Sequence, residues 1–220
     1  FFSFSTLRNS IKTKKLKEEV YLNNNHFNGD KISIRKIVTD IDEKGFSETF
    51  KLNEEIKKKI LFECLTNGEF ETKKITSNIN IGSLKISENE SLDNYINKLK
   101  KYKISRITKT INLDSKESTL RNVILSKEIL QIAENYLNSK KISINASFFI
   151  SNPLKISESE KYRNAQYFHW DNDFTKFFKM YIYLNDVTDN NGPHIYIPNT
   201  HKIKKNENKL CRLYSDKNIK

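Results

Sequence analysis

Residues 176–184 constrain the fold of this chain most, because apolar and polar residues alternate along them. Successive side chains of a β-strand point to opposite faces, so this alternation predicts a strand with one face buried. One face carries Met180, Ile182 and Leu184, and the other carries Lys179, Tyr181 and Tyr183. We expect the apolar face to pack beneath helices and the polar face to line an internal cavity.

A histidine and a carboxylate, His169 and Asp171, stand two residues apart just before this strand. On an extended strand both side chains point to the same face, so they are predicted to reach one metal ion together. Neutral nitrogen with anionic oxygen suits a first-row transition metal, and two histidines with one carboxylate form the site of non-haem Fe(II) oxygenases. Taken alone, the triplet favours a simpler interpretation, a His–Asp hydrogen bond at the surface of an ordinary sheet. Asp173, four residues after His169, does not share this spacing.

The residues that follow give the triplet a context. After the alternating strand come Asp186-Val187, a turn at residues 190–193, and a second strand that ends in the letters IPNTHK at Lys202. This order resembles the phytanoyl-CoA dioxygenase family, in which H-x-D is followed by a YL-x-D-V, N-G-P and P-G-S-H-K run. Asn199 stands where that family usually has Gly, and Asn is the residue that best tolerates the left-handed conformation after glycine.

The resemblance implies an α+β fold, a double-stranded β-helix (a jelly-roll, cupin-like barrel) with helices packed on its outer face. It implies an oxidoreductase, an Fe(II)- and 2-oxoglutarate-dependent dioxygenase that hydroxylates a C–H bond of a small-molecule substrate with O₂. His169 and Asp171 would be the metal ligands and catalytic residues. Lys179 and Tyr181 would contact the 2-oxoglutarate co-substrate, although a lysine here is also typical of a side chain that extends to solvent.

Two parts of the family's site have no counterpart in this chain. No histidine follows His201, and Arg212, the one later arginine, is not preceded by the distal histidine that the family carries. We therefore expect the third ligand and the carboxylate partner to lie outside this chain and the barrel to be incomplete at its C-terminal end. Because the chain starts at Phe1 without an initiator Met, we expect a fragment that is inactive in isolation. The alternative is a non-catalytic jelly-roll binding module with an incomplete metal site.

Each remaining histidine has more than one interpretation. His26 lies in a polar, Asn-rich loop and is expected to be exposed. His194 either lines the cavity or lies at the edge of a strand. His201 fixes the turn or helps to cap the site, or it folds back as the third metal ligand.

The first 140 residues are expected to support this β region. Residues 1–30 are predicted as a polar extension with a weak helix at 11–21, and residues 31–220 as one domain, with helix-rich support at 31–140 and a β core at 141–220. Spacing predicts strands at 31–39, 103–113, 141–150 and 165–170, and a polar loop at 151–164. Helices are predicted after the caps Asn53 and Ser126 and over residues 91–102.

Composition excludes several classes of protein. The net charge is +12, but only six of the 39 basic residues are Arg and the lysines are spread along the chain, which argues against specific nucleic-acid binding. Cys64 and Cys211 form no zinc or disulfide pattern, which fits a reducing cytoplasm. No apolar run approaches the roughly 20 residues that span a membrane.

Overall fold

The computed structural model of this protein describes residues 2–6, 21–22, 26–28, 32–47, 51–66, 92–101, 103–152, 154–155, 157–163, 166–169, 171, 176–202 and 213–214. Helices and antiparallel strands are mixed along the chain, which makes the fold α+β as predicted. The weak helix expected at 11–21 falls almost entirely outside these residues, as do Asp173, Cys211 and Arg212.

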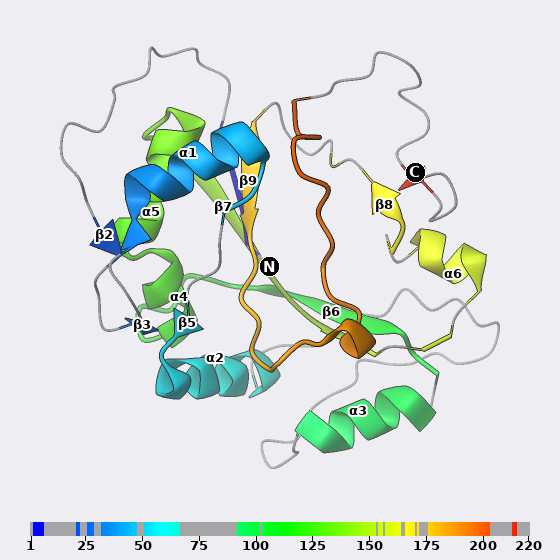
Figure 1. Cartoon of the computed structure of the whole chain (residues 1–220). Coiled ribbons are helices and arrows are strands. Elements are labelled where there is room, and N and C mark those ends of the chain that lie inside the picture. Colours follow the sequence, from blue (N-terminus) through cyan, green and yellow to red (C-terminus); the bar gives the residue numbers. More distant parts are fainter. Residues whose placement is uncertain are drawn as a thin grey trace.

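The main sheet has four antiparallel strands (Figure 1). Their order is β6 (Arg106–Ile111), β7 (Ile142–Ser151), β1 (Phe2–Thr6) and β9 (Phe177–Met180). Strand β1 lies between β7 and β9, with Phe4 opposite both Ile144 and Phe178. The sequence predicted a polar extension for residues 1–30, whereas its first residues occupy an interior position of the sheet.

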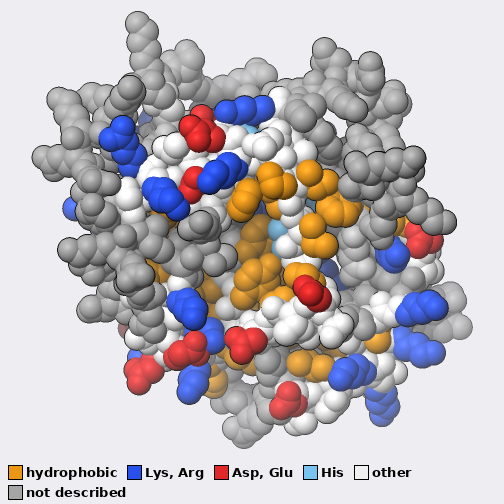
Figure 2. All heavy atoms as spheres, in the orientation of Figure 1, with side chains coloured by type: hydrophobic (Ala, Val, Ile, Leu, Met, Phe, Trp, Pro, Cys, Tyr) orange, Lys and Arg blue, Asp and Glu red, His pale blue; other side chains and the backbone are white. Residues whose placement is uncertain are grey.

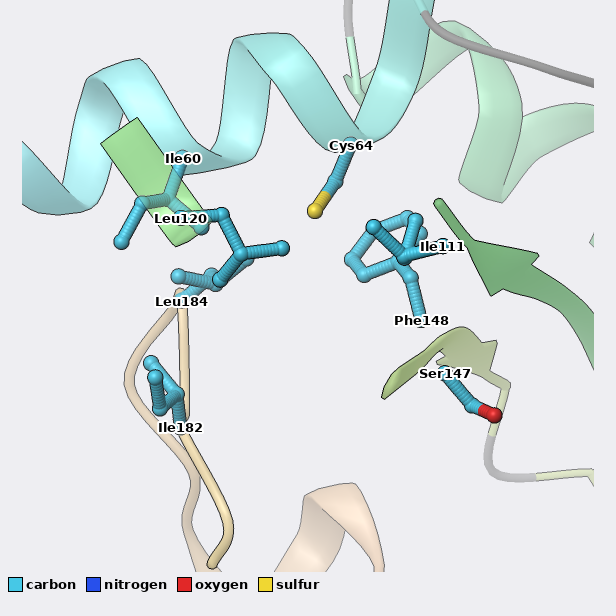
Figure 3. Close-up of a pocket in the computed structure, with 8 residues that line it drawn as sticks. All are labelled: Ile60, Cys64, Ile111, Leu120, Ser147, Phe148, Ile182 and Leu184. Atoms are coloured by element: carbon cyan, nitrogen blue, oxygen red, sulfur yellow. The ribbon is translucent and has the colours of Figure 1, made fainter. Parts of the chain in front are cut away.

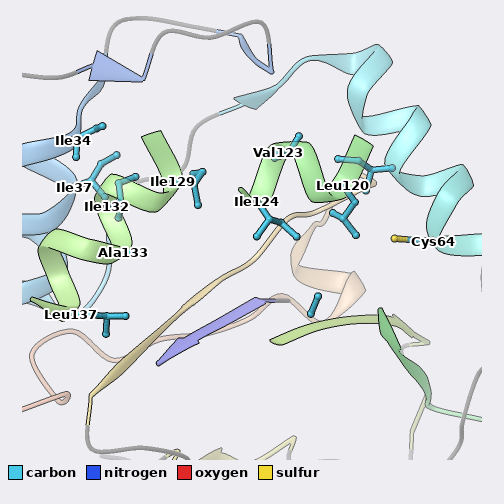
Figure 4. Close-up of a cluster of buried hydrophobic side chains, with 12 residues drawn as sticks. Ile34, Ile37, Cys64, Leu120, Val123, Ile124, Ile129, Ile132, Ala133 and Leu137 are labelled. Carbon is cyan, nitrogen blue, oxygen red and sulfur yellow. The ribbon is translucent and has the colours of Figure 1, made fainter. Parts of the chain in front are cut away.

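Helices cover one face of this sheet (Figure 1). They are α1 (Ile34–Lys44), α2 (Glu54–Thr66), α4 (Thr119–Ile124) and α5 (Lys127–Leu137). Their buried side chains, among them Ile37, Ile60 and Ile129, form one core with Ala146 of β7 (Figure 4). A smaller core joins Leu99 of α3 (Leu92–Lys101) to Ile107 and Ile150. The prediction that the apolar helical stripes pack on a sheet is confirmed.

Local capping accounts for where several helices begin. The Asn53 side chain accepts a hydrogen bond from the Glu55 amide at 2.9 Å, and the helix predicted after this cap is present as α2. Helix α5 begins directly after Ser126, the predicted cap, without a side-chain capping bond. The predicted helix at 91–102 and strands at 103–113 and 141–150 are also confirmed, each within about three residues of its expected ends.

The strand predicted at residues 31–39 is wrong. The segment forms β4 (Ile32–Ser33) for two residues only and then helix α1. The Ser33 hydroxyl caps this helix by accepting a bond from the Lys36 amide at 3.3 Å. Ile34, Ile37 and Ile41 recur at helical spacing, and the first two are buried against α5 and the core, so tertiary packing decides for the helix.

Three further expectations in the β region fail or are met only in part. The second strand expected before Lys202 is not a strand, because residues 192–197 run without ladder partners among the described residues. The loop expected at 151–164 contains α6 (Glu158–Arg163). The strand predicted at 165–170 is reduced to β8 (Phe168–His169), which pairs with β10 (Leu213–Tyr214).

The remaining ladders are short. They pair β2 (Tyr21–Leu22) with β4 and β3 (Phe27–Asn28) with β5 (Lys51–Leu52). Over the residues that the structure describes, the strands form these separate sheets and do not close into a barrel. None of the described helices has both the length and the apolar character needed to cross a bilayer.

Candidate metal site

The strand predicted at residues 176–184 forms only as β9 (Phe177–Met180), but the alternating side chains still lie on two sides as predicted. Met180, Ile182 and Leu184 pack against the main helical core. Lys179 points the other way and contacts Asp171. The chain thus carries its polar side chains on the face of the sheet that the core helices leave uncovered, and we call this the polar face.

The structure brings His169 and Asp171 side by side. His169 Nε2 lies 3.5 Å from Asp171 Oδ1, and the two side chains retain 26% and 31% of their exposure. His169 Nδ1 lies 2.7 Å from the carbonyl oxygen of Tyr167, so Nδ1–H donates to that oxygen and the ring is held with Nε2 toward the carboxylate. Metal-binding histidines are commonly oriented by such a bond from their other nitrogen.

Lys179 completes this cluster from β9. Its ammonium donates to Asp171 Oδ2 and lies 5.6 Å from the centroid of the Phe177 ring. Burial by itself raises the pKa of the Asp171 carboxyl, but hydrogen bonds from His169 and Lys179 outweigh it and lower that pKa to about 2. The carboxyl is therefore an anion at neutral pH, as a metal ligand must be.

The His169–Asp171 geometry fits two ligands of one ion. Two donor atoms about 2.1 Å from a metal and at right angles lie about 3.0 Å apart. The observed 3.5 Å between Nε2 and Oδ1 needs only a small side-chain rotation to match. Within the described parts of the chain, no three His, Cys, Asp or Glu side chains gather closely enough to hold a metal by themselves.

Tyr181 and His194 extend the site along the polar face. Their rings stack with centroids 4.5 Å apart and an interplanar angle of 30°. Burial lowers the pKa of His194, and the positive charge of nearby His169 lowers it further. Burial raises the pKa of the Tyr181 hydroxyl, and the charge of Asp171 adds to that increase. His194 therefore stacks on Tyr181 and belongs to no strand among the described residues.

Arg106 is a member of this face that the sequence analysis missed. Its guanidinium carbon lies 4.3 Å from the centroid of the Phe149 ring on the neighbouring strand. Burial lowers the pKa of Arg106, and the negative charge of an ionised Tyr181 acts in the opposite direction. Its position in the alternating strand at 103–113 was the available signal, because Ile107 and Ile111 assign Arg106 to the opposite face.

His201 lies elsewhere, at the end of helix α1. Its Nε2 lies 2.9 Å from the carbonyl oxygen of Asp42, and the Asn199 amide donates to the carbonyl of Lys44 at 2.8 Å. Asn199 adopts the left-handed conformation with φ 64°, which confirms that Asn can serve at this turn. Of the roles considered for His201, the structure supports fixing the turn, because its ring is bonded to α1.

A small cavity of about 20 Å³ lies on the opposite, helix-covered side of the sheet (Figure 3). It has room for roughly one water molecule. Cys64 lines it, and burial raises the pKa of this thiol to about 12 despite the positive charge of Lys109. This cavity is too small for a substrate and is separate from the His169–Asp171 pair, and Cys64 is a buried thiol as the sequence predicted.

The fold and this cluster together define a helix-backed antiparallel sheet beside whose open face a histidine–carboxylate pair lies, with a lysine and a tyrosine near it. No protein-family model, curated protein or solved structure matches this chain.

Proposed function

We propose that this protein is an Fe(II)- and 2-oxoglutarate-dependent dioxygenase that hydroxylates a C–H bond of a small molecule. One observation carries the proposal: His169 Nε2 and Asp171 Oδ1 lie 3.5 Å apart while the other ring nitrogen is bonded to a backbone carbonyl. The motif resemblance from His169 to Lys202 supplies the reaction class. We further propose that the sheet is part of a double-stranded β-helix.

In this proposal the chain's own residues divide the work. His169 Nε2 and Asp171 Oδ1 would hold the metal, which when bound supplies the oxidation of 2-oxoglutarate and of the C–H bond. Lys179 and Tyr181 would hold the carboxylate of 2-oxoglutarate, because a cation and a hydroxyl replace the hydration that the carboxylate loses. The Tyr167 carbonyl fixes the imidazole orientation. A third protein ligand would come from outside the described residues.

Metal binding and turnover test this proposal with matched variants. Anaerobic titration of this chain with Fe(II), and succinate release from 2-oxoglutarate by the full-length protein in the presence of O₂, are compared for the wild type, His169→Ala and Asp171→Ala. His26→Ala and Asp189→Ala remove the same side chains from the turn before β3 and from an exposed 3₁₀ turn, so they serve as controls. We expect both site variants to lose at least about tenfold in affinity for Fe(II) and all succinate release, with both controls unchanged. Equal succinate release from all five proteins would refute the assignment.

One contact favours a second candidate function, a jelly-roll binding module without catalysis. The Lys179 ammonium occupies Asp171 Oδ2, so a lysine already balances the charge of the proposed ligand. In a binding module that has lost its catalytic activity, the ion pair between Lys179 and Asp171 would take the place of the ion pair between the metal and Asp171. If Lys179→Met also fails to bind Fe(II) while the protein stays folded, the module is the better description.

A further inference from the structure

The carbonyl of Tyr167, which orients the His169 ring, lies just outside the strand that carries this ring. The ladder between β8 and β10 pairs Phe168 with Tyr214 and His169 with Leu213, so it begins one residue after Tyr167. Tyr167 itself lies at a bend of the chain. Among the described residues, the direction of its carbonyl therefore depends on contacts other than strand pairing.

Helix α6, which lies beside β8, supplies two such contacts (Figure 1). The Gln166 amide donates to the carbonyl of Lys161 at 3.0 Å, which ties the chain just before Tyr167 to the helix. The Tyr167 hydroxyl donates to the carboxylate of Glu158, the first residue of α6. Because the chain on one side of Tyr167 and its side chain are both attached to α6, a change in the direction of its carbonyl would strain or break one of these bonds.

Lys161 holds the Glu158 carboxylate from the same helix. Its ammonium lies 3.2 Å from Glu158 Oε1, whereas the Tyr167 hydroxyl bonds to Oε2, so the two oxygens have separate partners. The same ammonium lies 5.9 Å from the centroid of the Tyr167 ring. Figure 2 shows charged side chains of both signs at the edge of the molecule where Figure 1 places α6. The Glu158 side chain keeps 73% of its exposure, so water competes for it and we expect its effect to be modest.

We propose that Glu158 is a positioning residue for the His169 imidazole and acts on it through the hydroxyl and the carbonyl of Tyr167. The importance of this for a metal rests on the dioxygenase function proposed above, because His169 Nε2 is one of the proposed ligands. The positioning itself needs no metal, because protein atoms make every contact from Glu158 to His169.

The His169 Nδ1–H proton in the metal-free protein reports this positioning. NMR of protein with ¹⁵N-labelled histidine detects the proton while it is bonded to the Tyr167 carbonyl, and His169→Ala identifies the signal by removing it. Tyr167→Phe keeps the ring and the carbonyl but removes the hydroxyl. We expect this variant to speed the exchange of Nδ1–H with water at least about threefold, the lower range for the net loss of one hydrogen bond. An unchanged exchange rate, or no protected Nδ1–H in the wild type, would overturn the proposal.

A double-mutant cycle shows whether Glu158 acts through Tyr167. Glu158→Ala should speed the same exchange by about the same factor as Tyr167→Phe, and Glu158→Gln, which keeps an acceptor oxygen, should recover part of the protection. Two residues that act through one bond are not additive, so the double variant should show no more than the larger single effect. A double effect equal to the product of the single effects would refute this route. Glu117→Ala, an exposed carboxylate before α4, is the control and should change nothing.

Fe(II) affinity separates this inference from the dioxygenase proposal. In anaerobic titration, Tyr167→Phe is expected to weaken Fe(II) binding about threefold, less than the loss of about tenfold or more expected for His169→Ala. If the exchange rates change as expected but the wild type binds no Fe(II), the positioning role stands and the dioxygenase fails. If the wild type binds Fe(II) and releases succinate while Tyr167→Phe and Glu158→Ala change neither exchange nor affinity, the dioxygenase stands and the positioning role is refuted.

Discussion

Gly45→Ala adds one methyl group at the end of helix α1 and should test whether residues 196–202 are held against this helix. It ends the helix in the left-handed conformation, with φ 86° and its amide donating to the carbonyl of Ile41. A Cβ at this position would lie 2.6 Å from His201 Nδ1 and closer still to the hydroxyl oxygen of Tyr196. Real Cβ atoms do not approach other atoms so closely, so Gly45→Ala must move the side chains of Tyr196 and His201.

Two effects are expected to lower the free energy of unfolding of the Gly45→Ala variant. Holding alanine at positive φ costs about 1 kcal/mol. Moving the His201 ring breaks its bond to the Asp42 carbonyl, which is worth about 1 kcal/mol. We therefore expect the free energy of unfolding to fall by about 2 kcal/mol.

Gly192 provides the matched control. It also has positive φ, 70°, but a Cβ there would meet nothing within 4 Å, so Gly192→Ala should cost only the backbone strain of about 1 kcal/mol. Urea unfolding followed by circular dichroism measures both values from the midpoint and slope. If the two variants lose the same stability within about 0.5 kcal/mol, the segment is not held against α1 and the reasoning is refuted.

Two further predictions concern carboxylates. In the metal-free protein the pKa of Asp171 is lowered from 3.8 to about 2, so its stabilisation is complete above pH 3.8 and is lost as the pH falls toward 2. Thermal unfolding between pH 4 and 2 should show a loss that Asp171→Asn reduces by on the order of 1 kcal/mol, and equal pH dependence of the two proteins would contradict this. Glu63 accepts bonds from the amides of Thr119 (2.7 Å) and Leu120 (3.2 Å) at the start of α4, so Glu63→Ala should lower the free energy of unfolding by about 1–2 kcal/mol in urea. Exposed Glu55→Ala should cost less than half as much, and similar losses would refute the capping role.

Elements with local signals were predictable from the sequence. Helix α2 has an Asn cap and an apolar stripe, and β7 has ten residues of strand-forming composition, so each needs no distant partner to be recognised. Residues 31–44 show the limit of this approach. Ile32 and Ile34 alternate like a strand while Ile34, Ile37 and Ile41 recur like a helix, and only the burial of Ile34 and Ile37 decides between the two patterns.

The residues of the candidate site also divide into those that the local sequence could place and those that it could not. His169 and Asp171 are two residues apart on an extended backbone, so their proximity follows from local geometry. Lys179 was expected at the site, but its ion pair with Asp171 depends on how β9 lies relative to β8. Alternation assigned Arg106 to the face opposite Ile107, but it could not show how β6 and β9, at opposite edges of the sheet, lie relative to each other.

The sequence by itself determined the apolar and polar faces of residues 176–184, the pairing of imidazole 169 with carboxylate 171, and most of the helices, because these depend on residues a few positions apart. Only the tertiary structure decided that β1 enters the sheet, that α1 is a helix, and which cations stand near the carboxylate. Those outcomes depend on burial and on contacts between distant segments, and no local pattern specifies the distance between two such segments.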